Sequence, residues 1–150
     1  MRAVSFCDEN GIDIMMNISD IEDESALICA NLRGSGIVQA SLSENRHDER
    51  EYWVKFLNSF YDAKVSVVTL GSYGAVTYDG NAVYEVAADT ITPLHLHGAG
   101  AAFSAGFLAK YLGGLPVEKC IGFGCKMGSL SCTEYRLFEK ILTNNGKDLL

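Results

Sequence analysis

Leu94-His-Leu-His-Gly-Ala-Gly-Ala-Ala-Phe-Ser-Ala-Gly-Phe-Leu108 is the stretch of sequence that decides the fold. Its glycine-rich turn, Gly98-Ala-Gly100, comes directly before a helical pattern in which Phe103 and Phe107 lie one turn apart. The first turn of a helix presents unpaired backbone amides, and the helix dipole adds positive potential there. The pattern therefore predicts either an anion site, for phosphate above all, or a tight turn that packs the helix closely against a strand.

The segments before this turn predict a sheet. Val65 to Leu70 (VSVVTL) is an almost unbroken β-branched run that ends at Gly71, and a strand apolar on both faces is typical of a parallel sheet covered by helices. Ala75 to Tyr78 and Ala82 to Val86 then flank Asp79-Gly80-Asn81, which is a strong signal for a β-hairpin.

Farther towards the N-terminus, the sequence predicts two more strands and two helices. The strands are Ala3 to Cys7 and Ile37 to Ala40, and the helices are Ile21 to Leu32 and Asp48 to Phe60, the second with an acidic first turn. Aromatic residues four apart in that second helix are expected in the core: Tyr52, Phe56 and Phe60.

Helices follow the glycine-rich turn. They are expected at Gly100 to Leu112, from Pro116 onward, and at Thr133 to Leu142, the second with a stripe of small residues at Cys120, Gly124 and Gly128. The order β-α-β-α-β, a hairpin and then helices predicts a single α/β layered domain over residues 1–150.

The composition excludes several kinds of partner. The chain has 12 Lys and Arg against 19 Asp and Glu, a net charge of -7, and no basic stripe. Nucleic acid and anionic membranes both require clustered cations, so neither is expected as a partner. A bound phosphate would be held by backbone amides, a helix N-terminus or a metal ion, because no arginine cluster is available.

The cysteines and the N-terminus predict a soluble, cytoplasmic domain. Five cysteines, with no C-x-x-C pair, argue against a disulfide framework and a zinc knuckle. We interpret Cys120, Cys125 and Cys132 as buried small residues. No signal peptide and no membrane-spanning run is found. His95 and His97 alternate, so with His47 or a cysteine they are an alternative metal site, but ordinary polar or packing roles are more typical and no metal site is predicted.

Four stretches of the sequence together resemble the ribokinase-type (PfkB) carbohydrate kinases. Thr69-Leu-Gly71-x-x-Gly74 is similar to the family's "T-L-G-x-x-G", and Gly98 to Leu108 is similar to the signature "D-T-x-G-A-G-D-x-F-x-A-G-F". Leu115 to Gly124 resembles the family's later helix, and Ile37 to Glu44 stands where the family has "N-x-x-E". The resemblance covers about Ser35 to Ser131, and within the family the sequence looks closest to fructoselysine-kinase-like members.

This resemblance implies a ribokinase-like three-layer α/β/α fold, with a Rossmann-like parallel sheet and a hairpin, and ATP-dependent phosphoryl transfer to a sugar hydroxyl with Mg²⁺. By carry-over, the anion hole would be Gly98, Ala99 and Gly100. Thr69, Gly71 and Gly74 would line the nucleotide site, and Glu44 would help organise the magnesium–water network. Gly124 and Cys125 would border the adenine, although Gly124 and Gly128 would equally serve close helix packing.

Departures from the family pattern bear on activity. The family's general base, the last aspartate of "G-A-G-D", is replaced by Ala101, the signature's first aspartate by His95, and the asparagine of "N-x-x-E" by Ser41. Alanine cannot accept the proton of the sugar hydroxyl, and loss of a positioned base costs about 10²–10⁴ in rate. Transfer is therefore expected to be impaired, which leaves the possibilities of an active kinase fragment, a non-catalytic nucleotide-binding module, or a remnant that only oligomerises.

Family members are longer than this chain, and their N-terminal half supplies the sugar-binding residues. We therefore expect residues 1–150 to be equivalent to the C-terminal half, truncated on the N-terminal side. A sheet interrupted in this way would expose an unpaired edge and apolar surface, which predicts a homo-oligomer.

Overall fold

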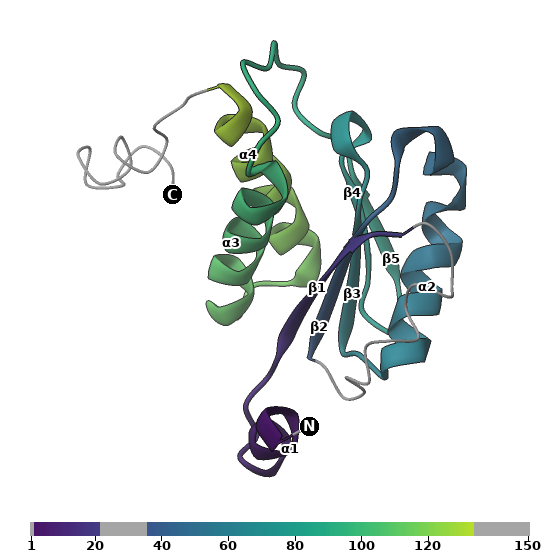
Figure 1. The fold of residues 1–150 in the computed structure, drawn as a ribbon, viewed down its shortest axis with the longest axis vertical. Helices are drawn as coiled ribbons and strands as arrows, with labels where there is room; N and C mark the ends of the chain where they lie inside the picture. Colours follow the sequence, from purple (N-terminus) through teal and green to yellow (C-terminus); the bar gives the residue numbers. More distant parts are fainter. Residues whose placement is uncertain (1, 22–35, 134–150) are drawn as a thin grey trace, which may run out of the picture.

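The computed structural model describes residues 2–21 and 36–133, in which a five-stranded sheet lies between two layers of helices (Figure 1). Helix α2 (Arg50–Tyr61) covers one face, and α3 (Ala99–Leu112) and α4 (Val117–Thr133) cover the other. The predicted three-layer α/β fold is confirmed.

The sheet has the order β1-β2-β3-β4-β5. Strands β1 (Met15–Asp20), β2 (Ile37–Ser41) and β3 (Val65–Thr69) run parallel, and β4 (Ala75–Tyr78) and β5 (Val83–Val86) add an antiparallel meander. Because β2 and β3 are parallel, their carboxyl ends meet at one edge of the sheet, where Ser41 pairs with Thr69.

Strand β3 is buried on both faces, which explains its run of β-branched residues. Val65 and Val67 belong to the core beneath α3 and α4, whereas Val68 belongs to the core beneath α2. The one polar residue within the strand's buried stretch, Ser66, donates a hydrogen bond to the carbonyl oxygen of Val54 in α2. The prediction of an interior strand covered by helices is confirmed.

The predicted helix Asp48 to Phe60 is present, with two differences. A 3-10 helix, η2 (Glu44–Glu49), precedes it, and the α-helix ends at Tyr61. The aromatic stripe lies at the rim of the core, with Tyr52 exposed and Phe56 and Phe60 half-buried, so its placement in the core was wrong for Tyr52. The helix buries the neighbouring side chains Trp53, Val54, Leu57 and Tyr61.

The prediction of a strand at Ala3 to Cys7 was wrong. This segment lies in helix α1 (Arg2–Glu9), which ends where Ile12 N donates to Cys7 O and Gly11 adopts a positive φ of 64°. A short apolar run does not distinguish helix from strand by periodicity. The strand in this part of the chain, β1, was missed because its residues, MMNISD, show little β-propensity.

The remaining elements agree with the sequence. Asp79 accepts hydrogen bonds from the amides of Asn81 and Ala82 and so closes the hairpin, and α3 and α4 begin within one residue of their predicted starts. Ile21 is buried and its amide bonds to Ser41 O, so it extends the sheet instead of opening a helix. The rest of the predicted helix to Leu32, and that of Thr133 to Leu142, lie outside the described residues, apart from Thr133.

Two predictions about side chains and membranes can be compared with the described part of the chain. Cys120, Cys125 and Cys132 are buried and unpaired, as expected of small core residues. Among the described helices, none is long and apolar enough to cross a membrane.

Candidate functional site

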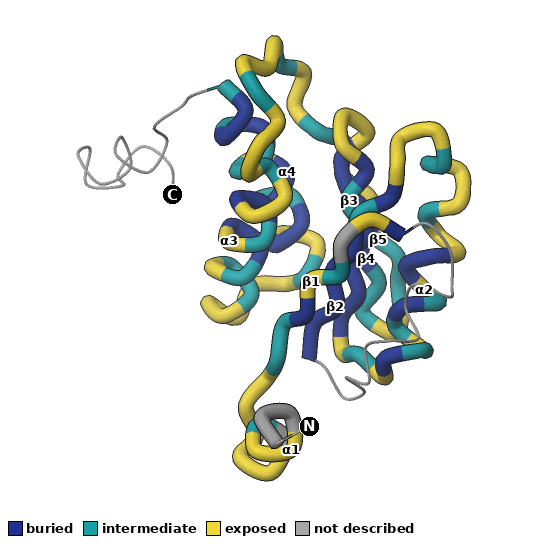
Figure 2. The backbone as a smooth tube through the Cα atoms, in the orientation of Figure 1, coloured by how far each residue is buried: buried dark blue, intermediate teal, exposed yellow. Residues whose placement is uncertain are grey.

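The first turn of α3 is open to solvent. Gly98 is the N-cap, with a φ of 83°, and Gly98, Gly100 and Ala101 are all exposed (Figure 2). A Cβ atom built at Gly98 or Gly100 would meet nothing within 4 Å. Ala102 N is the amide that bonds back to Gly98 O, at 2.9 Å, so the helical ladder begins there. Of the amides before it, that of Ala99 donates to Leu96 O at 3.4 Å. The amides of Gly100 and Ala101 belong to the first turn of the helix, where the dipole favours an anion.

A second turn lies at the same edge of the sheet, after β3. The 3-10 turn η3 (Gly71–Tyr73) is closed by Leu70 N donating to Gly74 O and by Gly74 N donating to Gly71 O. Just before the turn, Thr69 Oγ1 lies 3.0 Å from Ser41 Oγ. Thr69 is therefore held by β2, and its hydroxyl lies beside the position where the family has asparagine.

Glu44 lies against this turn. Ser72 N donates a hydrogen bond of 2.7 Å to Glu44 Oε1, and the same oxygen occupies the place that a Cβ atom on Gly71 would take. The bond from the Ser72 backbone lowers the pKa of Glu44 below its usual value, because it stabilises the carboxylate. Two residues that the sequence predicted for one site, Glu44 and Gly71, are thus in contact.

Three predicted site residues are engaged in packing. Gly74 has a φ of 95°, and a Cβ atom there would collide with Val86 O and the backbone of Ala88. A Cβ atom on Gly124 would lie 2.9 Å from the ring of Phe103, so Gly124 allows α3 and α4 to approach closely. Cys125 is buried with its Sγ 3.7 Å from Val86 O, and burial raises its pKa to about 11.

Ala101 stands exposed on the open turn and offers no proton acceptor. His95, in place of the signature's first aspartate, is half-buried, and the amides of Leu94 and His95 point to Cys132 O at the end of α4. Within residues 2–21 and 36–133, no three side chains of His, Cys, Asp or Glu gather into a group that could hold a metal ion.

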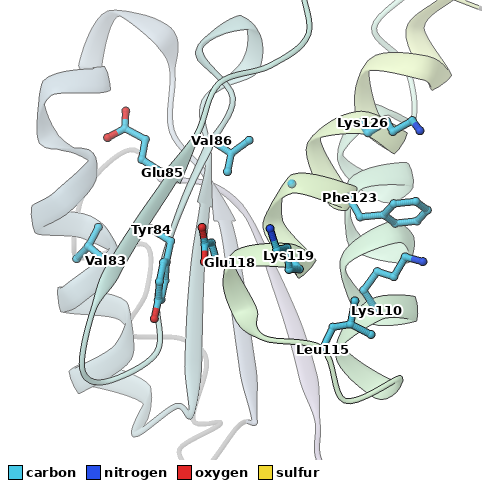
Figure 3. A pocket seen from close by; sticks show the side chains of 11 residues that line it. Val83, Tyr84, Glu85, Val86, Lys110, Leu115, Glu118, Lys119, Phe123 and Lys126 are labelled. Carbon is cyan, nitrogen blue, oxygen red and sulfur yellow. The ribbon is translucent and has the colours of Figure 1, made fainter. Parts of the chain in front are cut away.

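A groove between β5 and α4 was not anticipated. It has a volume of about 680 Å³, and its walls include Val83, Tyr84, Val86, Leu115 and Phe123, with Lys110, Lys119 and Lys126 at its margins (Figure 3). None of the predicted site residues lines it. Its residues come from three separate segments that only tertiary packing joins, so no local motif pointed to it.

Comparison with known proteins places the chain in one family. The profile of the pfkB family carbohydrate kinases matches residues 3–142. The chain is similar to a cytidine kinase of Thermococcus kodakarensis, with 40% identity over 67 residues, which are 43% of this chain and 24% of that protein. It therefore spans well under two thirds of the length of that relative.

Solved structures show the same fold. Phosphofructokinase-2 from Escherichia coli in complex with potassium matches with a TM-score of 0.74 and 20% identity, over 89% of this chain and 45% of that one. A microbiome-derived acarbose kinase matches with a TM-score of 0.70 and 22% identity, over 87% and 45%. A candidate ribokinase II from Escherichia coli, in complex with ATP and Mg²⁺, matches with a TM-score of 0.67 and 20% identity, over 89% and 46%.

The match of the family profile covers nearly the whole chain, and the chain has a turn at each of the family's two glycine motifs, Gly71–Tyr73 after β3 and the N-terminus of α3. The chain belongs to the pfkB family of carbohydrate kinases.

Proposed function

We propose that residues 1–150 form the nucleotide-binding, C-terminal half of a ribokinase-type kinase, with ATP as the nucleotide, and that phosphoryl transfer to a sugar hydroxyl is impaired. The observation that carries this proposal is the open first turn of α3, where Gly98 and Gly100 leave free space above exposed backbone amides. Thr69, Gly71 and Glu44 lie at the same edge of the sheet, as a nucleotide site would require.

The chemistry of transfer depends mainly on positioning and on fixed dipoles. The amides of Gly98 and Gly100 would donate to the terminal phosphate, joined by that of Ala99 once its 3.4 Å bond to Leu96 O opens. The helix dipole would stabilise the charge of the phosphate. No group at Ala101 removes the proton from an attacking hydroxyl, so a bound sugar would react about 10²–10⁴ times more slowly than with a base in place.

A magnesium ion fits this site only in a limited way. Mg²⁺ prefers oxygen ligands and commonly keeps several waters while it is held by substrate phosphates and one or two carboxylates. Glu44 is the carboxylate that the family pattern places here, and Ser41 and Thr69 add hydroxyl oxygens. These residues would hold a hydrated ion that arrives with the nucleotide and neutralises phosphate charge.

We place the adenine differently in detail from the sequence prediction. Gly124 is occupied by its contact with Phe103, whereas the groove between β5 and α4 begins at Val86, next to Cys125. Apolar walls suit a purine base, so we place the base at this end of the groove, with Cys125 behind it.

Thermal unfolding with Mg·ADP and Mg·ATP tests nucleotide binding. A ligand at about 100 times its dissociation constant should add roughly 2.7 kcal/mol to the free energy of unfolding. Stabilisation without ATP consumption supports the proposal, and no stabilisation by either nucleotide contradicts it. The double variant His95→Asp, Ala101→Asp, assayed with a range of sugars, then asks whether the missing carboxylates alone limit transfer.

A second candidate function is that of a non-catalytic oligomerising module. It is favoured by the exposed Phe6 and Ile12, which precede β1 in the chain, and by β1 itself, which forms one edge of the described sheet. Apolar surface next to a strand edge is typical of an interface between copies. Light scattering that gives the mass of a stable monomer would remove this candidate.

A further inference from the structure

The 3-10 helix η2 (Glu44–Glu49) is held in place without burying any of its own residues. It is also irregular, since Arg46 departs from helical geometry with a φ of -111° and a ψ of 16°. Apolar burial normally fixes a short helix, because isolated short helices are not stable in water. Besides its continuity with α2 at Arg50, the position of η2 therefore depends on specific contacts of its side chains.

Two of these contacts reach the turn η3. Besides the bond from Ser72 N to Glu44 Oε1, the ring of His47 stacks on Tyr73, with centroids 4.5 Å apart and an interplanar angle of 3°. His47 Nδ1 lies 3.2 Å from Glu44 O, which orients the ring. Ser72 and Tyr73 are the two variable positions of the Thr69-Leu-Gly-x-x-Gly74 motif. Side chains of η2 therefore contact both residues in the middle of that turn.

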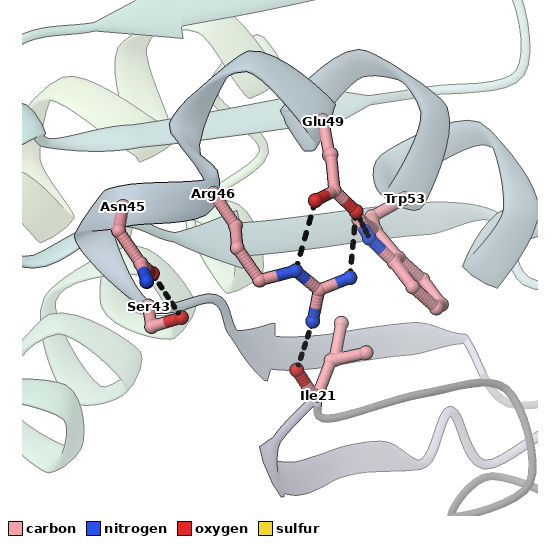
Figure 4. A network of polar contacts seen from close by, with 6 residues as sticks. All are labelled: Ile21, Ser43, Asn45, Arg46, Glu49 and Trp53. Atoms are coloured by element: carbon pink, nitrogen blue, oxygen red, sulfur yellow. Dashed lines mark hydrogen bonds and ion pairs between the residues drawn. The ribbon is translucent and has the colours of Figure 1, made fainter.

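The other contacts tie η2 to the core and to β1 (Figure 4). Arg46 Nε and Nη2 donate to Glu49 at 2.9 and 2.6 Å, and Nη1 donates to Ile21 O at 2.9 Å. Trp53 Nε1 donates to Glu49 Oε2 at 3.0 Å, and its ring faces the guanidinium at 5.4 Å. Trp53 is buried beneath α2, so the network anchors η2 to a rigid element.

We infer that η2 is a positioning element for the nucleotide site: through Glu44 and His47 it fixes the turn Gly71–Tyr73, and through Arg46 it fixes that turn relative to the core. This inference rests on the proposed nucleotide binding. A turn held in one conformation presents its amides to a ligand without first being ordered. If only a fraction of the molecules has the ordered turn, the apparent affinity for the ligand falls in proportion to that fraction. His47 and Arg46 would act through the turn and not touch the nucleotide.

Calorimetric titration with Mg·ADP tests the inference. His47→Ala removes the stack on Tyr73, and aromatic pairs of this kind are worth about 0.5–1.5 kcal/mol, so the dissociation constant should rise by about 2- to 12-fold. His47→Phe keeps a stacking ring and should restore most of the affinity. Lys55→Ala is the matched control, because it removes another exposed contact, to Glu51, away from the turn.

A cycle with Tyr73→Ala separates the possible results. If His47 acts through the stack, the double variant binds no more weakly than the single Tyr73→Ala variant, and hydrogen exchange at the Ser72 amide accelerates in His47→Ala even without nucleotide. If the parent binds Mg·ADP and His47→Ala matches Lys55→Ala in affinity and in exchange, this inference alone is wrong. If the parent binds no nucleotide, the proposed function fails and the inference fails with it.

Discussion

Four glycines of the family's motifs form two pairs with opposite surroundings. Gly98 and Gly100 are exposed, and a methyl group on either would meet open space. Gly74 and Gly124 are buried, and a methyl group on either would overlap Ala88 N, at 2.6 Å, or the ring of Phe103, at 2.9 Å. Gly98 and Gly100 leave room for a ligand, whereas Gly74 and Gly124 leave room for neighbouring atoms of the protein.

This contrast shows that a glycine in a motif has no single meaning. Glycine permits a positive φ or a close approach, and only the surroundings tell which partner approaches. Alanine substitutions test this contrast. At the buried pair they should reduce the stability of the fold, and at the exposed pair they should weaken ligand binding.

The largest effect is expected for Gly74→Ala. The backbone conformation at Gly74, with a φ of 95°, is strained for any residue with a side chain, and the new methyl group would meet the backbone of β5 and Ala88, which has little freedom to move. We expect a loss of about 3 kcal/mol or more in the free energy of unfolding. Urea unfolding measures it, and a variant as stable as the parent would show that this turn is not packed as described.

Gly124→Ala should cost less, about 1–3 kcal/mol, because the opposing atoms belong to a side chain that can shift. Shortening the opposing ring tests this explanation, since Phe103→Leu in the same chain should recover part of the loss. Additive losses in the double variant would mean that the two residues do not compete for the same space.

The sequence predicted elements well where local and tertiary preferences agree. β3, with four valine and threonine side chains in five residues, and the hairpin around Asp79-Gly80-Asn81 carry strong local signals, and both were found. β1 was missed, because its Met, Asn, Ser and Asp residues form a strand only through pairing with β2. The same dependence on tertiary context made Ala3 to Cys7 look like a strand.

The candidate site was predictable in part for a similar reason. Gly98 and Gly100 precede a helix in the sequence itself, so their position at its N-terminus follows from a local pattern. The groove along β5 and the stack of His47 on Tyr73 join segments far apart in the chain, and no spacing encodes them. The packing role of Gly124 was one of two open alternatives, and only the contact with Phe103 establishes it.

Gly100→Ala tests the exposed pair, where ligand binding should change and stability should not fall. Alanine favours the helix, so the free energy of unfolding should stay the same or rise by about 0.4–1 kcal/mol. A methyl group on the open turn would instead crowd a bound phosphate. A crowding cost of about 1–3 kcal/mol corresponds to roughly 5- to 160-fold weaker binding of Mg·ADP. Unchanged affinity, measured by calorimetric titration, would argue against close approach of a phosphate to this turn.

The smallest effect concerns the exposed carboxylate that anchors η2. Hydrogen bonds from Arg46 and then Trp53 lower the pKa of Glu49 from 4.5 to about 2. Because the pKa in the folded state is the lower one, the stabilisation is complete above pH 4.5 and is lost as the pH falls towards 2. Glu49→Gln should therefore show a smaller fall in thermal midpoint over that interval than the parent.

Glu9→Gln, which removes a charge from an exposed position on α1, is the control and should follow the parent. Since exposed ion pairs are screened by salt, the difference between Glu49→Gln and the parent should shrink at high ionic strength. A difference that does not shrink would mean that the hydrogen bond donated by the uncharged indole of Trp53 holds η2 and the guanidinium does not.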